Sequence, residues 1–85
     1  MSTKTVIVGS TVGLHARPAT LIAEKAGEFG SEVLLGLPGQ EPVDASSALL
    51  IMTLGASYGA RVEVSGEDDA AVETVAALVA RNLDA

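Results

Sequence analysis

Four short stretches of the chain have the β-branched and alternating apolar pattern that is typical of strands. They are residues 3–8, 32–37, 41–43 and 61–65. In the last stretch, Val62 and Val64 lie on one side of the strand. The charged Arg61 and Glu63 lie on the other side, so one face is predicted to be buried and the other wet. The turn-forming Pro38-Gly39-Gln40 separates the second and third stretches, which predicts a hairpin.

Two longer stretches repeat apolar residues at three- and four-residue intervals and are predicted to form helices. The first runs from Ala16 to Ala26 and ends near Gly27, with Pro18 in a first turn that needs no N–H donor. The second is a C-terminal helix of roughly 14 residues. Acidic residues precede it and Arg81 lies near its end, which suits the helix dipole. Its apolar stripe consists of Val72, Val75, Ala76, Val79 and Leu83.

A shorter helix is predicted between the third and fourth strands, from about Ser47 to Leu54. Asp44 and Ser46 are its N-cap candidates, because their side chains can accept hydrogen bonds from the amides of a first helical turn. Gly55 follows the helix, and glycine readily adopts the left-handed conformation that ends one.

The elements follow the order βαββαβα, and the half-apolar strands require one covered face. An antiparallel sheet with helices packed on one side, an α+β fold, meets this requirement. A chain of 85 residues has room for one hydrophobic core, so we expect a single domain spanning residues 1–85. Phe29 and Tyr58 are its two aromatic residues, so the core is expected to be aliphatic and closely packed.

Charge and cysteine content exclude several classes of protein. Five basic residues against eleven acidic ones give a net charge of −6, which opposes nucleic-acid binding because that affinity comes largely from cations. Without Cys, and with one His, the chain has no thiol nucleophile and too few ligands for structural zinc, so we expect no metal and no cofactor. The longest apolar run, residues 48–52, is too short to span a membrane, and residues 1–15 lack a signal-peptide pattern. We therefore expect a soluble, cytoplasmic protein.

His15 and Arg17 lie at the start of the first predicted helix. The first backbone N–H groups of a helix lack intrahelical partners and, with the helix dipole, stabilise a phosphate. The dipole opposes a cation such as Arg17 in the first turn by up to about 1 kcal/mol, and a bound anion would remove this conflict. The pattern therefore favours a phosphoryl group at this position. The alternative is that His15 is an exposed loop residue and Arg17 a solvated charge.

An imidazole can take up a phosphoryl group covalently, because its neutral form is a nucleophile near neutral pH. Hydrolysis or transfer to a small substrate needs a base, an orienting carboxylate or a metal. No acidic residue occurs between Thr5 and Ala23. If His15 accepts a phosphoryl group, a carrier without turnover of its own is therefore favoured over an enzyme, and the residues alone leave open whether it does.

The segment Gly13-Leu14-His15-Ala16-Arg17-Pro18-Ala19-Thr20 resembles the active-site signature of HPr, the histidine-containing phosphocarrier of the bacterial phosphotransferase system. The resemblance extends to the chain length, the element order and Met52-Thr53-Leu54-Gly55. It implies an open-faced β-sandwich, with a four-stranded antiparallel sheet and three helices on one face. It also implies that His15 accepts a phosphoryl group on Nδ1 from phosphorylated enzyme I and passes it to enzyme IIA domains for sugar uptake. By the same match, Arg17 balances the phosphoryl charge and Pro18 starts the helix.

The family resemblance also implies a regulatory phosphorylation site at Ser47, with an HPr kinase/phosphorylase as a further partner. The alternative is that Ser46 caps the helix and Ser47 is its first residue. This segment departs from the family, which often has Lys where Ser46 stands and a large apolar residue where Ala48 stands. A kinase or transcriptional partner that reads those positions need not recognise this chain.

Apolar residues of the middle helix are candidates for partner docking. Leu49, Leu50 and Met52 cannot all lie on the buried face of so short a helix, so some must be exposed. The alternative is a poorly covered helix without a partner. The expected docking surface for enzyme I and IIA domains consists of Leu14, Thr20, Leu49, Leu50 and Met52.

Other functions remain open at the level of sequence. One is a regulatory HPr-like protein that acts through phosphorylated Ser47 on a transcription factor, and another is a variant that serves a nitrogen-related or kinase-linked phosphorelay. A third is a small-molecule-binding regulatory domain whose loop from Gly13 to Pro18 binds an anion noncovalently. In each case we expect a monomer that neither binds nucleic acid nor inserts into a membrane.

Overall fold

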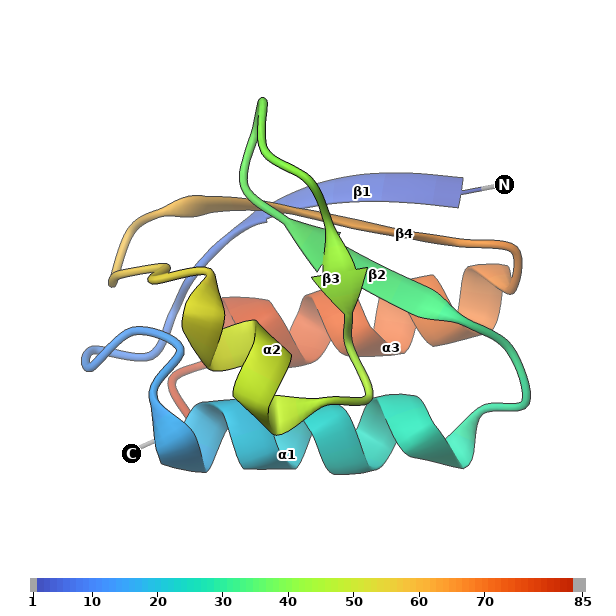
Figure 1. Cartoon of the computed structure of the whole chain (residues 1–85), viewed down its shortest axis with the longest axis horizontal. Helices are drawn as coiled ribbons and strands as arrows, with labels where there is room; N and C mark the ends of the chain where they lie inside the picture. The colour runs from blue at the N-terminus through green and yellow to red at the C-terminus, as the bar shows by residue number, and fades with distance from the viewer. Residues whose placement is uncertain (1, 84–85) are drawn as a thin grey trace.

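The computed structural model describes residues 2–83. Its seven elements follow the predicted order (Figure 1). They are β1 Ser2–Ile7, α1 Ala16–Glu28, β2 Val33–Gly36, β3 Val43–Asp44, α2 Ala48–Thr53, β4 Arg61–Gly66 and α3 Asp69–Ala80. The predicted antiparallel sheet of four strands with three helices is confirmed.

The sheet has the strand order β1-β4-β2-β3, and every neighbouring pair is antiparallel. The hairpin of β2 and β3 is confirmed by the pairing of Leu35 with Val43. The central strand β4 pairs with β1 on one side and with β2 on the other, so Val64 lies opposite both Lys4 and Leu35. The first strand of the chain is thus joined to the last.

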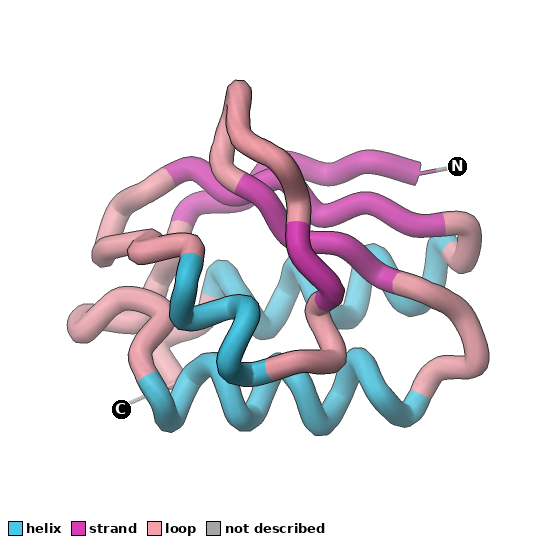
Figure 2. The backbone as a smooth tube through the Cα atoms, in the orientation of Figure 1, coloured by secondary structure: helices cyan, strands magenta, loops and turns pink. Residues whose placement is uncertain are grey.

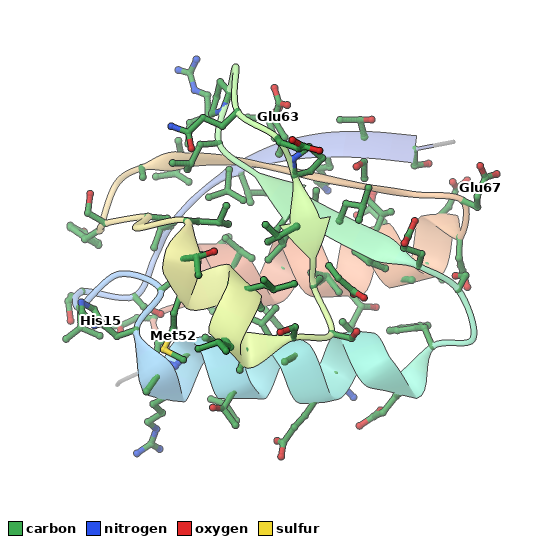
Figure 3. The ribbon with its side chains drawn as sticks, viewed as in Figure 1. His15, Met52, Glu63 and Glu67 are labelled. Carbon is green, nitrogen blue, oxygen red and sulfur yellow. The ribbon has the colours of Figure 1, made fainter. Side chains whose placement is uncertain are left out.

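The helices cover one face of the sheet and leave the other face to solvent (Figure 2). Val62 and Val64 of β4 are completely buried on the covered face, whereas Arg61 and Glu63 are exposed, as their alternation predicts. Glu63 can be followed on the uncovered side in Figure 3. This arrangement is the open-faced sandwich.

The core between sheet and helices is built from aliphatic side chains, as the composition predicts. Helix α3 is anchored by its predicted stripe, and α1 buries Pro18 with the apolar face that its spacing predicts. The fully buried side chains of α1 and α3 include Ile22, Val75 and Val79, and those of the sheet include Leu35, Val62 and Val64.

Two details of the helix ends differ from the sequence predictions. The N-cap of α2 is Ser47, whose Oγ accepts a hydrogen bond from the Leu50 amide, so Asp44 and Ser46 are not the caps. Asp44 and Ser46 are hydrogen-bonded to each other instead: the carboxylate of Asp44 accepts from both the amide and the hydroxyl of Ser46. Helix α3 has 12 residues, and Leu83 lies beyond its end. Gly55 has the predicted left-handed conformation, with φ of +65°.

No helix formed within residues 2–83 is long and apolar enough to cross a membrane.

Candidate functional site

His15 is the N-cap residue of α1 and has an extended backbone. Its side chain is exposed and makes no capping hydrogen bond to the helix. The imidazole is therefore not engaged in holding the helix together, unlike the N-cap side chains of Ser47 and Asp68, which accept first-turn amides. The exposed imidazole is therefore not committed to a structural role at the start of α1.

The loop before α1 is held by close backbone contacts that fix where His15 lies. Gly13 has φ of +76°, and a Cβ atom at this position would lie 2.6 Å from the carbonyl oxygen of Ala56. The next residue, Leu14, donates its amide to that same oxygen at 2.9 Å. Glycine is required here both for the backbone conformation and for the close approach. The loop is thereby fixed to the segment that follows α2.

Two backbone donors remain free at the start of α1. The amides of Ala16 and Arg17 lie in the first turn, where no intrahelical acceptor exists, and no other group within residues 2–83 accepts from them. Pro18 has no N–H, and the amide of Ala19 already donates to the His15 carbonyl at 2.9 Å. Together with the helix dipole, the two free amides favour an anion beside His15.

Arg17 provides an exposed positive charge next to these amides. Its side chain is exposed, and no carboxylate in the described part of the chain lies within ion-pair distance of it. Lys4 and Lys25, by contrast, pair with Glu73 and Glu28. Among residues 2–83 the Arg17 guanidinium has no competing partner, so it is available to an incoming anion.

A cavity of about 160 Å³ lies where the β1–α1 loop meets the end of α2. His15 and Met52 both lie on its wall, and Figure 3 shows them at the same end of the molecule, away from Glu67. Val12 and Ser57 also line this cavity but carry no signal in the local sequence, because they meet only through the fold. The lining residues are Val12, Leu14, His15, Met52, Gly55, Ala56 and Ser57.

The exposure predicted for α2 is confirmed for all three of its candidate docking residues. Leu49, Leu50 and Met52 are 70%, 40% and 37% exposed, while Ile51 is completely buried. Thr20 is also exposed, with its hydroxyl donated to the Ala16 carbonyl. An apolar, solvent-exposed rim of this kind suits transient protein contacts.

The expectation of an exposed Leu14 is wrong. Leu14 is 4% exposed and belongs to the core, because its amide is bound to Ala56 and the loop turns its side chain inward. Its buried side chain anchors the loop to the core. Val12, which is 49% exposed and two residues earlier, presents the apolar surface that the sequence analysis assigned to Leu14.

Ser47 lies at the start of α2 and does not line the cavity around His15. Its neighbour Asp44 has a pKa lowered from its ordinary value, first by the backbone N–H of Ser46 and then by the hydroxyl of Ser46. A carboxylate that is charged at neutral pH therefore lies near this predicted modification site. Across residues 2–83, no three His, Cys, Asp or Glu side chains are grouped so that they could hold a metal ion.

Known proteins match this chain over nearly its whole length. Residues 2–81 match the family described as "PTS HPr component phosphorylation site". The phosphocarrier protein HPr of Streptomyces coelicolor is 36% identical over 87 residues, which cover 99% of this chain and 94% of that protein.

Solved structures agree in fold. HPr-C-His from Thermoanaerobacter tengcongensis superposes with a TM-score of 0.88 at 32% identity, covering 100% of this chain and 98% of that chain. An HPr from Bacillus anthracis str. Ames gives a TM-score of 0.84 at 32% identity, covering 92% of this chain and 95% of that chain. The sequence match and the shared fold agree with the signature around His15, and the chain belongs to the HPr family of phosphocarriers of the phosphotransferase system.

Proposed function

We propose that His15 accepts a phosphoryl group from phosphorylated enzyme I and passes it to enzyme IIA domains. The observation that carries the proposal is an exposed imidazole that makes no capping hydrogen bond, at the start of a helix with two amides that no group within residues 2–83 accepts from. The lone pair of the neutral ring nitrogen attacks phosphorus, and a P–N bond forms as the bond between phosphorus and the donor breaks. The donor retains the electron pair of the broken bond. By family resemblance the attacking nitrogen is Nδ1.

The residues around His15 support reversible transfer. The amides of Ala16 and Arg17 and the guanidinium of Arg17 can interact with the phosphoryl oxygens, which stabilises charge without a metal ion. Pro18 leaves the first turn with one donor fewer, so the anion is held by few contacts and remains transferable. The chain thus acts as a carrier that enzyme I phosphorylates and the IIA domains dephosphorylate, and it has no turnover of its own.

Partner binding is assigned to the apolar rim beside His15. The surface consists of Val12, Thr20, Leu49, Leu50 and Met52. It gives enzyme I and the IIA domains one shared contact area next to the transferring nitrogen. We further propose that residues 1–85 form a single domain and that the protein acts as a cytoplasmic monomer. Sugar specificity then resides in the partners.

Labelling with enzyme I and radioactive phosphoenolpyruvate tests the assignment. The wild-type protein should acquire a label that survives alkali and is lost in acid, and His15→Ala should acquire none. Because the His15 side chain makes no hydrogen bond to the helix, the variant should keep the circular dichroism spectrum of the folded protein. Ser47→Ala serves as the matched control and should be labelled normally. Labelling of His15→Ala would place the acceptor elsewhere.

Arg17→Glu tests the charge assignment. A carboxylate beside the acceptor opposes the incoming phosphoryl group, so the transfer rate from enzyme I should fall while the fold is preserved. A normal rate would remove Arg17 from the site.

Ser47 is a second proposed phosphorylation site, where modification would regulate the carrier. Its Oγ accepts the amide of Leu50, and Leu50 belongs to the docking surface, so a phosphate there would change the charge beside the surface that enzyme I contacts. Incubation with an HPr kinase and ATP should give an acid-stable label that Ser47→Ala loses and Ser46→Ala keeps. Equal labelling of both variants would exclude Ser47.

A further inference from the structure

Ser10 is the one completely buried polar residue among residues 2–83, with an exposure of 0%. Its hydroxyl makes two hydrogen bonds: Oγ donates to the carbonyl oxygen of Arg81 at 3.2 Å and accepts from the amide of Leu83 at 3.1 Å. Both partners lie just beyond α3, more than seventy residues away in the sequence. A serine side chain therefore takes the place of helical hydrogen bonds at the end of the last helix.

The residue before Ser10 strengthens the same contact. Gly9 donates its amide to the carbonyl of Val79 at 3.0 Å, one of the last carbonyls of α3 that lack a helical partner. A Cβ atom at Gly9 would lie 2.0 Å from the carbonyl oxygen of Ala80, so no larger residue fits without displacing the helix end. Residues 9 and 10 together cap the C-terminus of α3.

Ser10 also begins the turn that leads to His15. Its backbone carbonyl accepts the amide of Gly13 at 2.9 Å, which closes the turn through Thr11 and Val12. From Gly13 the backbone is held by Ala56 and then enters α1 at His15. One residue thus links the end of α3, through its side chain, to the loop that carries the acceptor, through its backbone.

We infer that Ser10 is a positioning residue. Its two hydrogen bonds to the segment Arg81–Leu83, which we call the brace, hold the His15 loop in the geometry for phosphoryl transfer. The inference rests on the proposed function of His15. Without the hydroxyl, the Arg81 carbonyl and the Leu83 amide lose their partner in a part-buried contact, and the loop can move away from α3. A small displacement of a reacting group lowers transfer strongly, whereas four of the five docking residues lie outside this loop: Thr20 on α1 and Leu49, Leu50 and Met52 on α2.

Ser10→Ala tests the brace by two independent measurements. With the variant as substrate of enzyme I, kcat should fall by about tenfold or more while KM changes little. Hydrogen exchange measured by NMR should show the Gly13 amide exchanging about tenfold faster, and the His15 ring resonances should shift. Thr11→Ala, an exposed residue of the same loop, and Val33→Ala, a buried residue of β2, control for sequence change and for lost stability. Neither should show these effects.

A second pair of variants leaves the amino-acid sequence of the loop unchanged. Leu83→Pro removes the amide that donates to Ser10 Oγ, and Leu83→Ala keeps that amide while losing similar packing. Faster exchange at Gly13 and a lower kcat should appear in Leu83→Pro alone. This pair remains informative if Ser10→Ala does not fold.

The outcomes separate the inference from the proposed function. Unchanged Gly13 exchange and unchanged His15 resonances in Ser10→Ala and Leu83→Pro would overturn the brace. A changed loop with a normal kcat would overturn the positioning role. If wild-type protein is not labelled by enzyme I, the proposed function fails, while the NMR comparison still decides whether Ser10 holds the loop.

Discussion

Replacement of Gly13 by alanine is expected to destabilise the protein by two separable effects. The backbone at Gly13 has φ of +76°, and an L-residue in this conformation costs about 1 to 2 kcal/mol. The new Cβ would also lie 2.6 Å from the Ala56 oxygen and 3.0 Å from the Ser57 Cα, both of them backbone atoms that cannot rotate away. The loop must then move, which weakens the hydrogen bond from Leu14 to Ala56, worth about 1 kcal/mol. The expected total is about 2 to 3 kcal/mol.

Two other glycines isolate the two effects. Gly59 has φ of +84°, but a Cβ atom added there would meet no other atom within 4 Å, so Gly59→Ala should show the conformational cost alone, about 1 to 2 kcal/mol. Gly27 lies inside α1 with open space around it, so Gly27→Ala should stabilise the protein by about 0.5 to 1 kcal/mol. Urea unfolding gives the free energy of unfolding for each variant, with constant m-values as the check on two-state behaviour.

One outcome would refute the proposed role of Gly13. If Gly13→Ala loses no more stability than Gly59→Ala, the approach of the loop to Ala56 costs nothing and does not fix the position of His15. If it loses more, enzyme I should also phosphorylate Gly13→Ala more slowly than Gly59→Ala, because only the former displaces the loop that leads into α1.

Three further predictions concern α2 and its surroundings. Ser47→Ala should lower the free energy of unfolding by about 1 kcal/mol through loss of the N-cap, and Ser46→Ala should lower it less; the reverse order would contradict the observed cap. The pKa of Asp44 is lowered from 3.8 in the folded state, so the stability it contributes is present above that value and is lost as pH falls through the folded pKa. Wild type and Asp44→Asn should accordingly differ in urea unfolding at neutral pH and converge in acid, and a constant difference would refute this. Leu50→Glu should raise the KM for enzyme I several-fold without a loss of stability, since Leu50 is 40% exposed; unchanged transfer kinetics would remove the docking role.

Most of the fold followed from local patterns in the sequence. The alternation of Val62 and Val64 with charged residues predicted the buried face of β4, and the spacing of Ile22 and its neighbours predicted the buried face of α1. These predictions succeed because strand and helix periods are local properties of the chain. The position of His15 at the start of α1 was predicted for the same reason.

The details that failed depend on competition or on distant contacts. Asp44, Ser46 and Ser47 are all good cap residues, and only the turn made by the first two leaves the cap to the third. The burial of Leu14 depends on Ala56, which is remote in the sequence. No period or motif near the candidate site encodes that contact, which exists only once the loop before α1 meets the segment after α2.

The strand order places a constraint on how the chain can fold during its synthesis. The central strand β4 separates β1 from β2, so β1 has no strand to pair with until β4 has been made, and only the β2–β3 hairpin can form earlier. Long-range strand pairing of this kind is formed late and slowly compared with local structure. The loop that carries His15 needs Ala56 and the end of α3 as well. A nascent chain on the ribosome therefore exposes His15, the proposed acceptor, without its folded surroundings, and we expect the loop to reach its final geometry only when the last helix docks.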